Sequence, residues 1–119
     1  MTQEEKNLLL RDLLARLPYG VKVLYENKVF SIDYISAIYE EIKLNIPDNY
    51  TIDISDVKPY LFPLSSMTEE QKDFYWNHSI DFGDAWTEVD WLNAHHFDYR
   101  GLIEKGLAIN ATGLGIYEW

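Results

Sequence analysis

Near the start of the chain, apolar residues recur at helical spacing. Five leucines between residues 9 and 17 follow three- and four-residue steps, a pattern that predicts one face of an amphipathic helix. Thr2 and Glu5 have the spacing of a capping box, and Pro18 would end the helix. Such an apolar stripe normally packs against a core, and binding of a partner helix is the less common use.

Beyond Gly20 the pattern changes to alternation. Residues 21–25 and 29–33 predict a β-hairpin, and residues 50–54 predict a half-buried strand. Residues 34–46 suit a helix by one apolar spacing and a strand by another, and their β-branched side chains favour the strand. Pro47 begins a turn.

Residues 58–64 contain two prolines. This predicts an extended connection against the core and argues against a central strand or a helix. Thr68 and Gln71 predict a second capping box, with a helix running to about Trp76 or His78. Thr87 is a weaker cap for a third helix that would end near His95.

The order of elements is a helix, then strands, then helices and glycine-punctuated loops. Segregated strands and helices predict an α+β fold with a small antiparallel sheet, in one domain covering residues 1–119. The strand lengths and turn spacing would allow a small SH3-like, partly open barrel.

Composition then limits the function. The net charge is −10, and residues 61–119 carry ten acids and three bases, or −7, against −3 for residues 1–60. This charge disfavours direct nucleic-acid binding and favours a cationic partner, although acidity alone also keeps a protein soluble. The chain has no cysteine, its N-terminus is acidic where a signal peptide is basic, and its leucine run is interrupted by Arg11 and Asp12, so we expect a cytoplasmic protein without a membrane span.

Acidic and aromatic residues concentrate between residues 60 and 100. Aromatic grooves rimmed by carboxylates recognise Pro-rich or Arg/Lys-bearing segments, so we predict a protein-binding surface here. The predicted aromatic and basic members are Tyr60, Trp86, Trp91, Tyr99 and Arg100. The predicted acidic rim is Asp84, Glu88 and Asp90. Tryptophans at this spacing are more often core residues, and dense carboxylates more often form a solvated face.

His95, His96 and Asp98 form the only cluster of metal-ligand types that the sequence brings together. Adjacent histidines diverge by about 100° on a helix and face opposite sides of a strand, so one ion would rarely take both. Packing of His96 near Phe97 and Tyr99, with His95 solvated, is the simpler interpretation. The sequence also lacks a nucleophile-elbow or phosphate-loop motif, and we predict neither a catalytic residue nor a cofactor.

Two segments resemble a known family. DVKPYLFPLSSMTEEQ (residues 56–71) and HFDYRGLIEKGLAINAT (residues 96–112) are similar to small uncharacterised proteins of gut bacteria and their phages and prophages, and residues 8–23 are more weakly similar. Phe62 stands where that family often has a basic residue. The resemblance implies a bacterial or phage origin and a cytosolic location, and it supplies no catalytic residues.

The leading hypothesis is therefore a non-enzymatic interaction protein, a phage or mobile-element accessory factor. A metal-dependent hydrolase using His95, His96 and Asp98 is the first alternative. A structural subunit of a homo-oligomer is the second.

Overall fold

A mixed sheet joins an N-terminal helix to two later helices. The computed structural model describes residues 1–47, 51–78 and 88–117. In chain order the elements are α1 (Gln3–Arg16), β1 (Lys22–Tyr25), β2 (Lys28–Ser36), β3 (Glu41–Leu44), β4 (Ile52–Asp53), β5 (Lys58–Pro63), α2 (Glu69–His78), α3 (Glu88–Ala94), β6 (Phe97–Asp98) and β7 (Ile109–Asn110).

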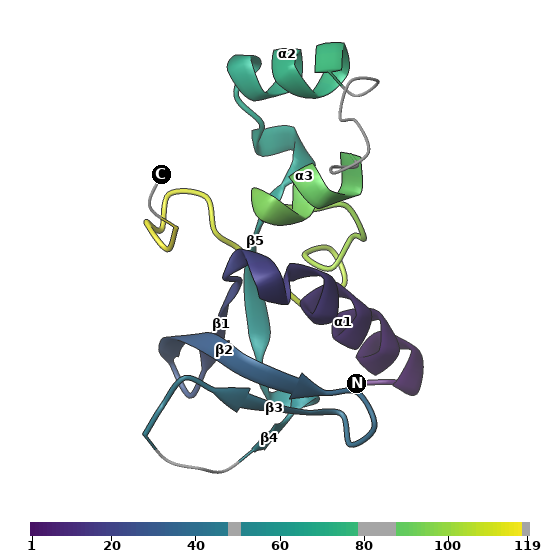
Figure 1. Cartoon of the computed structure of the whole chain (residues 1–119), viewed down its shortest axis with the longest axis vertical. Helices are drawn as coiled ribbons and strands as arrows, with labels where there is room; N and C mark the ends of the chain where they lie inside the picture. Colours follow the sequence, from purple (N-terminus) through teal and green to yellow (C-terminus); the bar gives the residue numbers. More distant parts are fainter. Residues whose placement is uncertain (48–50, 79–87, 118–119) are drawn as a thin grey trace.

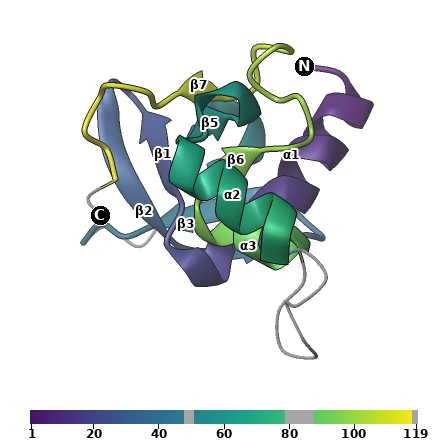
Figure 2. The same cartoon turned by 90° about the horizontal axis from the view of Figure 1, so that it is seen from above.

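Strand β5 connects the two halves of the molecule. Figure 1 shows it running from the β1–β4 strands toward α2 and α3. Helix α1 lies on one side of this strand, and the C-terminal segment lies on the other in both views (Figures 1 and 2). Segments that precede and follow β5 in the sequence therefore lie on opposite sides of this strand.

The strand order is β4-β3-β2-β1-β5-β6, and β7 also pairs with β5. Strands β1 to β4 pair antiparallel, whereas β6 and β7 each pair parallel with β5. The predicted α+β class is confirmed. The sheet is mixed rather than wholly antiparallel, because two short C-terminal strands return to β5 after long connections, and an SH3-like barrel is not seen in this strand order.

The prediction that residues 58–64 are only a connection is wrong, because β5 is an internal strand. Its prolines lie at the second and last positions, Pro59 and Pro63, so the middle of the strand keeps its N–H groups. The Phe62 N–H donates to the His96 carbonyl at 2.8 Å, and the Leu61 carbonyl accepts from the Ala111 N–H at 2.8 Å. Both edges of β5 are thus paired without the proline nitrogens.

Residues 34–46 contain strands rather than a helix, as preferred. Strand β2 continues to Ser36, a turn follows, and β3 buries Ile42 and Leu44. The Ile35–Ile42 pair lies in register across the hairpin. The turn between the strands holds Ile38, whose place in the apolar pattern had suggested a core position.

Both predicted capping boxes are present. Glu5 N–H donates to the Thr2 hydroxyl and the Thr2 N–H donates to the Glu5 carboxylate. Thr68 and Gln71 make the same reciprocal pair at 2.9 and 3.1 Å. These bonds satisfy N–H groups that the first turn of a helix leaves without partners.

Side chains from α1, the sheet and the C-terminal loops form the main core. A second cluster holds Trp91, Leu92 and Phe97. No helix in the described parts of the chain is both long and apolar enough to cross a bilayer. The main core consists of Leu9, Leu13, Val21, Val23, Ile42, Leu44, Ile52, Ile54, Val57, Leu61, Leu102, Leu107 and Ala108.

Candidate functional site

The predicted binding residues do not form one open surface. Tyr60 and Trp91 are each 6% exposed, so their rings serve the interior in this conformation. Asp90 is half-buried on α3. Trp86 and Asp84 lie outside the described residues, and Glu88 is described only as the first residue of α3.

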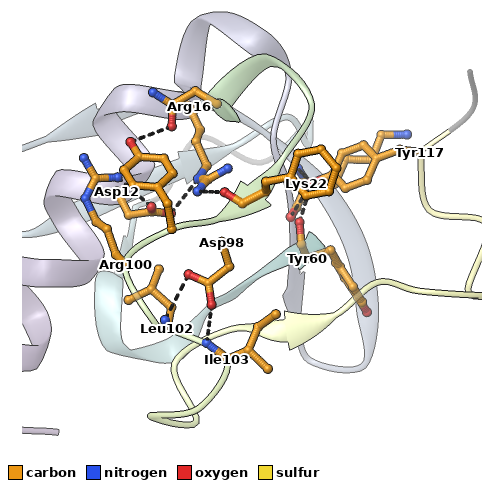
Figure 3. Close-up of polar contacts among 12 residues, drawn as sticks. Asp12, Arg16, Lys22, Tyr60, Asp98, Arg100, Leu102, Ile103 and Tyr117 are labelled. Atoms are coloured by element: carbon orange, nitrogen blue, oxygen red, sulfur yellow. Dashed lines mark hydrogen bonds and ion pairs between the residues drawn. The ribbon is translucent and has the colours of Figure 1, made fainter. Parts of the chain in front are cut away.

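Tyr99 and Arg100 take part in an internal network with helix α1. Asp12 and Arg16 are fully buried one helical turn apart, and Arg16 Nε donates to Asp12 Oδ2 at 2.8 Å. Arg100 donates to the other Asp12 oxygen at 2.7 Å from 88 residues away. We call Asp12, Arg16 and Arg100 the buried polar cluster, which Figure 3 shows between α1 and β6.

The buried polar cluster carries two guanidinium groups against one carboxylate. Arg16 also donates to the Phe97 carbonyl, but its Nη1 has no hydrogen-bond acceptor among the described residues. Burial of a charge is costly unless it is paired and fully hydrogen-bonded. The Arg16 guanidinium is therefore buried with one nitrogen unsatisfied among the described residues.

Tyr99 lies between the two guanidinium groups. Its ring centroid is 4.5 Å from the Arg100 Cζ and 5.3 Å from the Arg16 Cζ, within the range of cation–π attraction. Its hydroxyl donates to Asn93 Oδ1 at 2.9 Å. Tyr99 and Arg100, predicted as partner-binding residues, thus hold α1, α3 and β6 together.

The adjacent histidines diverge, as expected from their spacing. The His95 ring stacks on Trp91 with centroids 4.3 Å apart, and its Nδ1 lies 2.9 Å from the Trp91 carbonyl. His96 is only 4% exposed and stacks on Tyr117 at 3.8 Å. The expected neighbours of His96 were Phe97 and Tyr99. Its actual contact comes from the C-terminal segment, beyond the reach of local sequence reasoning.

The Asp98 carboxylate is hydrogen-bonded to backbone N–H groups. Its two carboxylate oxygens accept the Leu102 and Ile103 N–H groups at 3.0 and 2.9 Å, as Figure 3 shows. No group of three metal-ligand side chains occurs among the residues that the structure describes. Further residues of metal-ligand type nearby in sequence are His78, Asp81, Asp84 and Glu88, whose side chains the structure does not describe.

His96 adopts a left-handed backbone conformation, with φ at 62°. It follows the end of α3, where its N–H donates to the Asn93 carbonyl at 3.1 Å. Glycine normally takes this position after a helix, and other residues pay a steric cost there. This backbone turn directs the imidazole onto the Tyr117 ring and away from the His95 side.

A cavity of about 490 Å³ opens beside His96. Its walls come from the short 3-10 turn that follows α1, the start of β1, the end of α3 and the C-terminal segment. The Tyr117 hydroxyl fixes one wall, because it accepts from the Lys22 N–H at 2.9 Å and donates to the Tyr60 carbonyl at 2.8 Å. The residues that line the cavity include Tyr19, Lys22, Ala94, His96, Ile116 and Tyr117.

Burial and neighbouring charges shift the pKa values of the side chains that line this cavity. Burial, then the charges of Arg16, His95 and Lys22, lower the pKa of His96 to about 4, so the ring is neutral at pH 7. Burial raises the pKa of Tyr117 well above its ordinary value. At the rim, burial and then the Asp90 carboxylate raise the pKa of Tyr19.

His95 faces a smaller hollow of about 210 Å³. Phe62 and Phe97 form part of its wall, and Thr68 and Gln71 contribute polar groups at the start of α2. Because Thr68 and Gln71 already bond each other in the capping box, this hollow presents fewer available polar groups than the cavity beside His96.

The β2–β3 turn presents apolar side chains to solvent. Ile38 is 85% exposed, Tyr39 is 73% exposed, and Tyr34 on β2 is 47% exposed. We call these three residues the hairpin end. In residues 34–46, the apolar spacing of the preferred strand included Ile38, and Tyr39 belonged only to the helical alternative. Two apolar residues beside the acidic pair Glu40 and Glu41, within a turn, were the available signal.

Comparison with known proteins found no matching family model, no matching curated protein and no matching solved structure.

Proposed function

We propose that this protein is a non-enzymatic interaction module whose hairpin end binds a basic segment of a partner protein. The observation that carries the proposal is the exposure of Tyr34, Ile38 and Tyr39 together at one end of the sheet. Exposed apolar residues that are grouped, rather than scattered singly, characterise protein-binding surfaces. Tyrosine in particular contributes binding free energy out of proportion to its frequency.

Charge next to the hairpin end favours a basic partner. Asp33, Glu40 and Glu41 give three negative charges against one from Lys43, a balance of −2. Lys43 pairs with Asp33 at 3.2 Å, which leaves the two glutamates without a cationic partner among the described residues. Gln3 donates to one oxygen of Glu40 and holds it beside the turn. Complementary charge speeds association and selects the partner.

The proposal keeps the predicted function and moves its surface. The predicted residues Tyr99 and Arg100 are engaged inside the protein, whereas the hairpin end has few internal contacts to lose. The resemblance of residues 56–71 and 96–112 further supports an accessory role in a phage or mobile element, acting in the cytoplasm.

The test is selection of displayed random peptides on the immobilised protein, followed by affinity measurement on the selected peptides. We expect peptides that combine Lys or Arg with aromatic or branched aliphatic residues. Replacing Ile38 and Tyr39 together by Ser should weaken their binding at least tenfold, and higher salt should weaken it as well, because the attraction between exposed charges is screened.

As the matched control, a double variant replaces two exposed apolar residues elsewhere, Leu64 and Leu114, by Ser. These are 45% and 53% exposed and lie away from the hairpin end in sequence. If this control weakens binding equally, or if the selected peptides lack basic residues, the proposal is wrong. A concentration-dependent mass in light scattering that Ile38→Ser/Tyr39→Ser abolishes would instead assign the surface to a second copy of this chain.

A further inference from the structure

The cavity beside His96 combines a defined volume with positive charge in an otherwise acidic protein. Its volume of about 490 Å³ lies within the range of small-molecule sites. Ala94 and Ile116 give it apolar walls, and Tyr19 contributes an aromatic ring. The stacked rings of His96 and Tyr117, 12° from parallel, form a further flat wall.

Two cations act at this cavity. Lys22 lines it, and no hydrogen bond or ion pair engages the Lys22 ammonium within the described part of the chain. Arg16 lies behind the His96 wall, and in Figure 3 its guanidinium extends from Asp12 toward the side on which Lys22 and Tyr117 lie. Its Nη1 is buried and donates to no acceptor among the described residues.

Among the described residues, the charges nearest the cavity are mostly cationic, although the protein is acidic. Lys22 lines the cavity and Arg16 lies behind its His96 wall, whereas the buried carboxylates of Asp12 and Asp98 are engaged by the two arginines and by backbone N–H groups. Asp90 opposes these cations at the rim, where it lies beside the Tyr19 hydroxyl. Charges farther away count for little, since salt screens exposed charges beyond about 8 Å under physiological conditions.

We propose that this cavity binds a small organic anion, with its carboxylate or phosphate group at Lys22 and its flat, apolar body against the His96–Tyr117 rings. An anion there would pair the Lys22 ammonium and would be attracted by the Arg16 charge behind the His96 wall. Because the cavity and the hairpin end share no residue, this site stands independently of the proposed protein-binding function.

The test is a titration of the ¹⁵N-labelled protein with benzoate, with phenyl phosphate and with the neutral analogue benzyl alcohol, followed by NMR. We expect both anions to shift the amide signals of Gly20, Lys22 and Gly115, which border the cavity, with dissociation constants of about 1 mM, typical of ligands of this size. Benzyl alcohol should bind at least tenfold more weakly. The comparison of benzoate with phenyl phosphate decides which charged group the site prefers.

Two variants make the result specific. Lys22→Gln should weaken anion binding about tenfold, whereas Lys28→Gln, the same change at an exposed position of β2, should leave it unchanged. His96→Asn tolerates the left-handed backbone while removing the ring wall, and it should also weaken binding. Equal binding of benzyl alcohol, an equal effect of Lys28→Gln, or no shift of these amides by either anion would overturn the proposal.

Discussion

The buried polar cluster and the hairpin end distribute polar and apolar groups in opposite ways. In the cluster, Asp12 and Arg16 are fully enclosed, and the partly buried Arg100 joins them from 88 residues away in sequence. At the hairpin end, apolar side chains face solvent and touch little of the protein. The difference separates two kinds of residue. We expect changes in the cluster to act on folding, and changes at the hairpin end to leave folding nearly intact and to act on the proposed binding.

The largest expected effect is from Asp12→Ala. Removing the carboxylate leaves Arg16 buried without its ion pair, so the free energy of unfolding should fall by about 3–5 kcal/mol. Urea unfolding measures this change. As the control, Asp33→Ala breaks the exposed pair with Lys43 and should cost less than about 1 kcal/mol. Equal losses in the two variants would remove the distinction between the regions.

Asp98→Ala tests the second enclosed carboxylate. Two backbone N–H groups, from Leu102 and Ile103, would lose a charged acceptor, and we expect a loss of about 2–4 kcal/mol. Asp98→Asn keeps one acceptor oxygen and should cost roughly half as much. Thermal unfolding of both variants checks the ratio, and identical stabilities of Ala and Asn would show that the bonds matter little.

The pH dependence of stability gives a smaller effect. Because burial, Arg16, His95 and Lys22 lower the pKa of folded His96 to about 4, the unfolded chain takes up a proton first as the pH falls. Stability from this group is present above pH 6.5 and is lost as the pH falls toward 4. We expect about 2 kcal/mol to be lost between pH 7 and pH 5.

Urea unfolding at these two pH values tests the effect, with His96→Asn as the comparison. The variant lacks the titrating ring but accepts the same backbone conformation, so it should lose less stability over this range. His95 is present in both proteins and cancels in the comparison. The same loss in both proteins would contradict the assignment to His96.

The smallest expected effect on stability is at the hairpin end. Ile38→Ser combined with Tyr39→Ser should change the free energy of unfolding by less than about 0.5 kcal/mol, because these side chains are already in water. The same protein should show the largest loss of peptide binding. A strongly destabilised double variant, measured by thermal unfolding, would assign the hairpin end to folding instead.

Local signals predicted much of the fold. The capping boxes at Thr2 and Thr68 were readable because each depends on residues three positions apart. Strand β5 was missed because prolines usually exclude an internal strand, and nothing local shows that Pro59 and Pro63 occupy tolerated positions.

The candidate site was less predictable. Asp12 and Arg16 fall on the same helix face as Leu9 and Leu13, which was a usable signal for burial. Arg100, which bonds Asp12, is distant in sequence. Tyr117 is likewise distant from His96, although their stacked rings form one wall of the cavity. Contacts of this kind depend on tertiary packing, which periodicity does not encode.

The position of β5 has a consequence during synthesis of the chain. Tyr60 pairs in register with Ile109. Because the ribosome adds roughly 5–20 residues per second, this part of β5 is synthesised a few seconds before the strand that pairs with it. An unpaired strand edge in that interval invites pairing with other chains. Pro59 and Pro63 flank this unpaired segment and offer no N–H to another chain. The two prolines that argued against a strand in the sequence thus reduce the hydrogen bonds through which the nascent protein could aggregate.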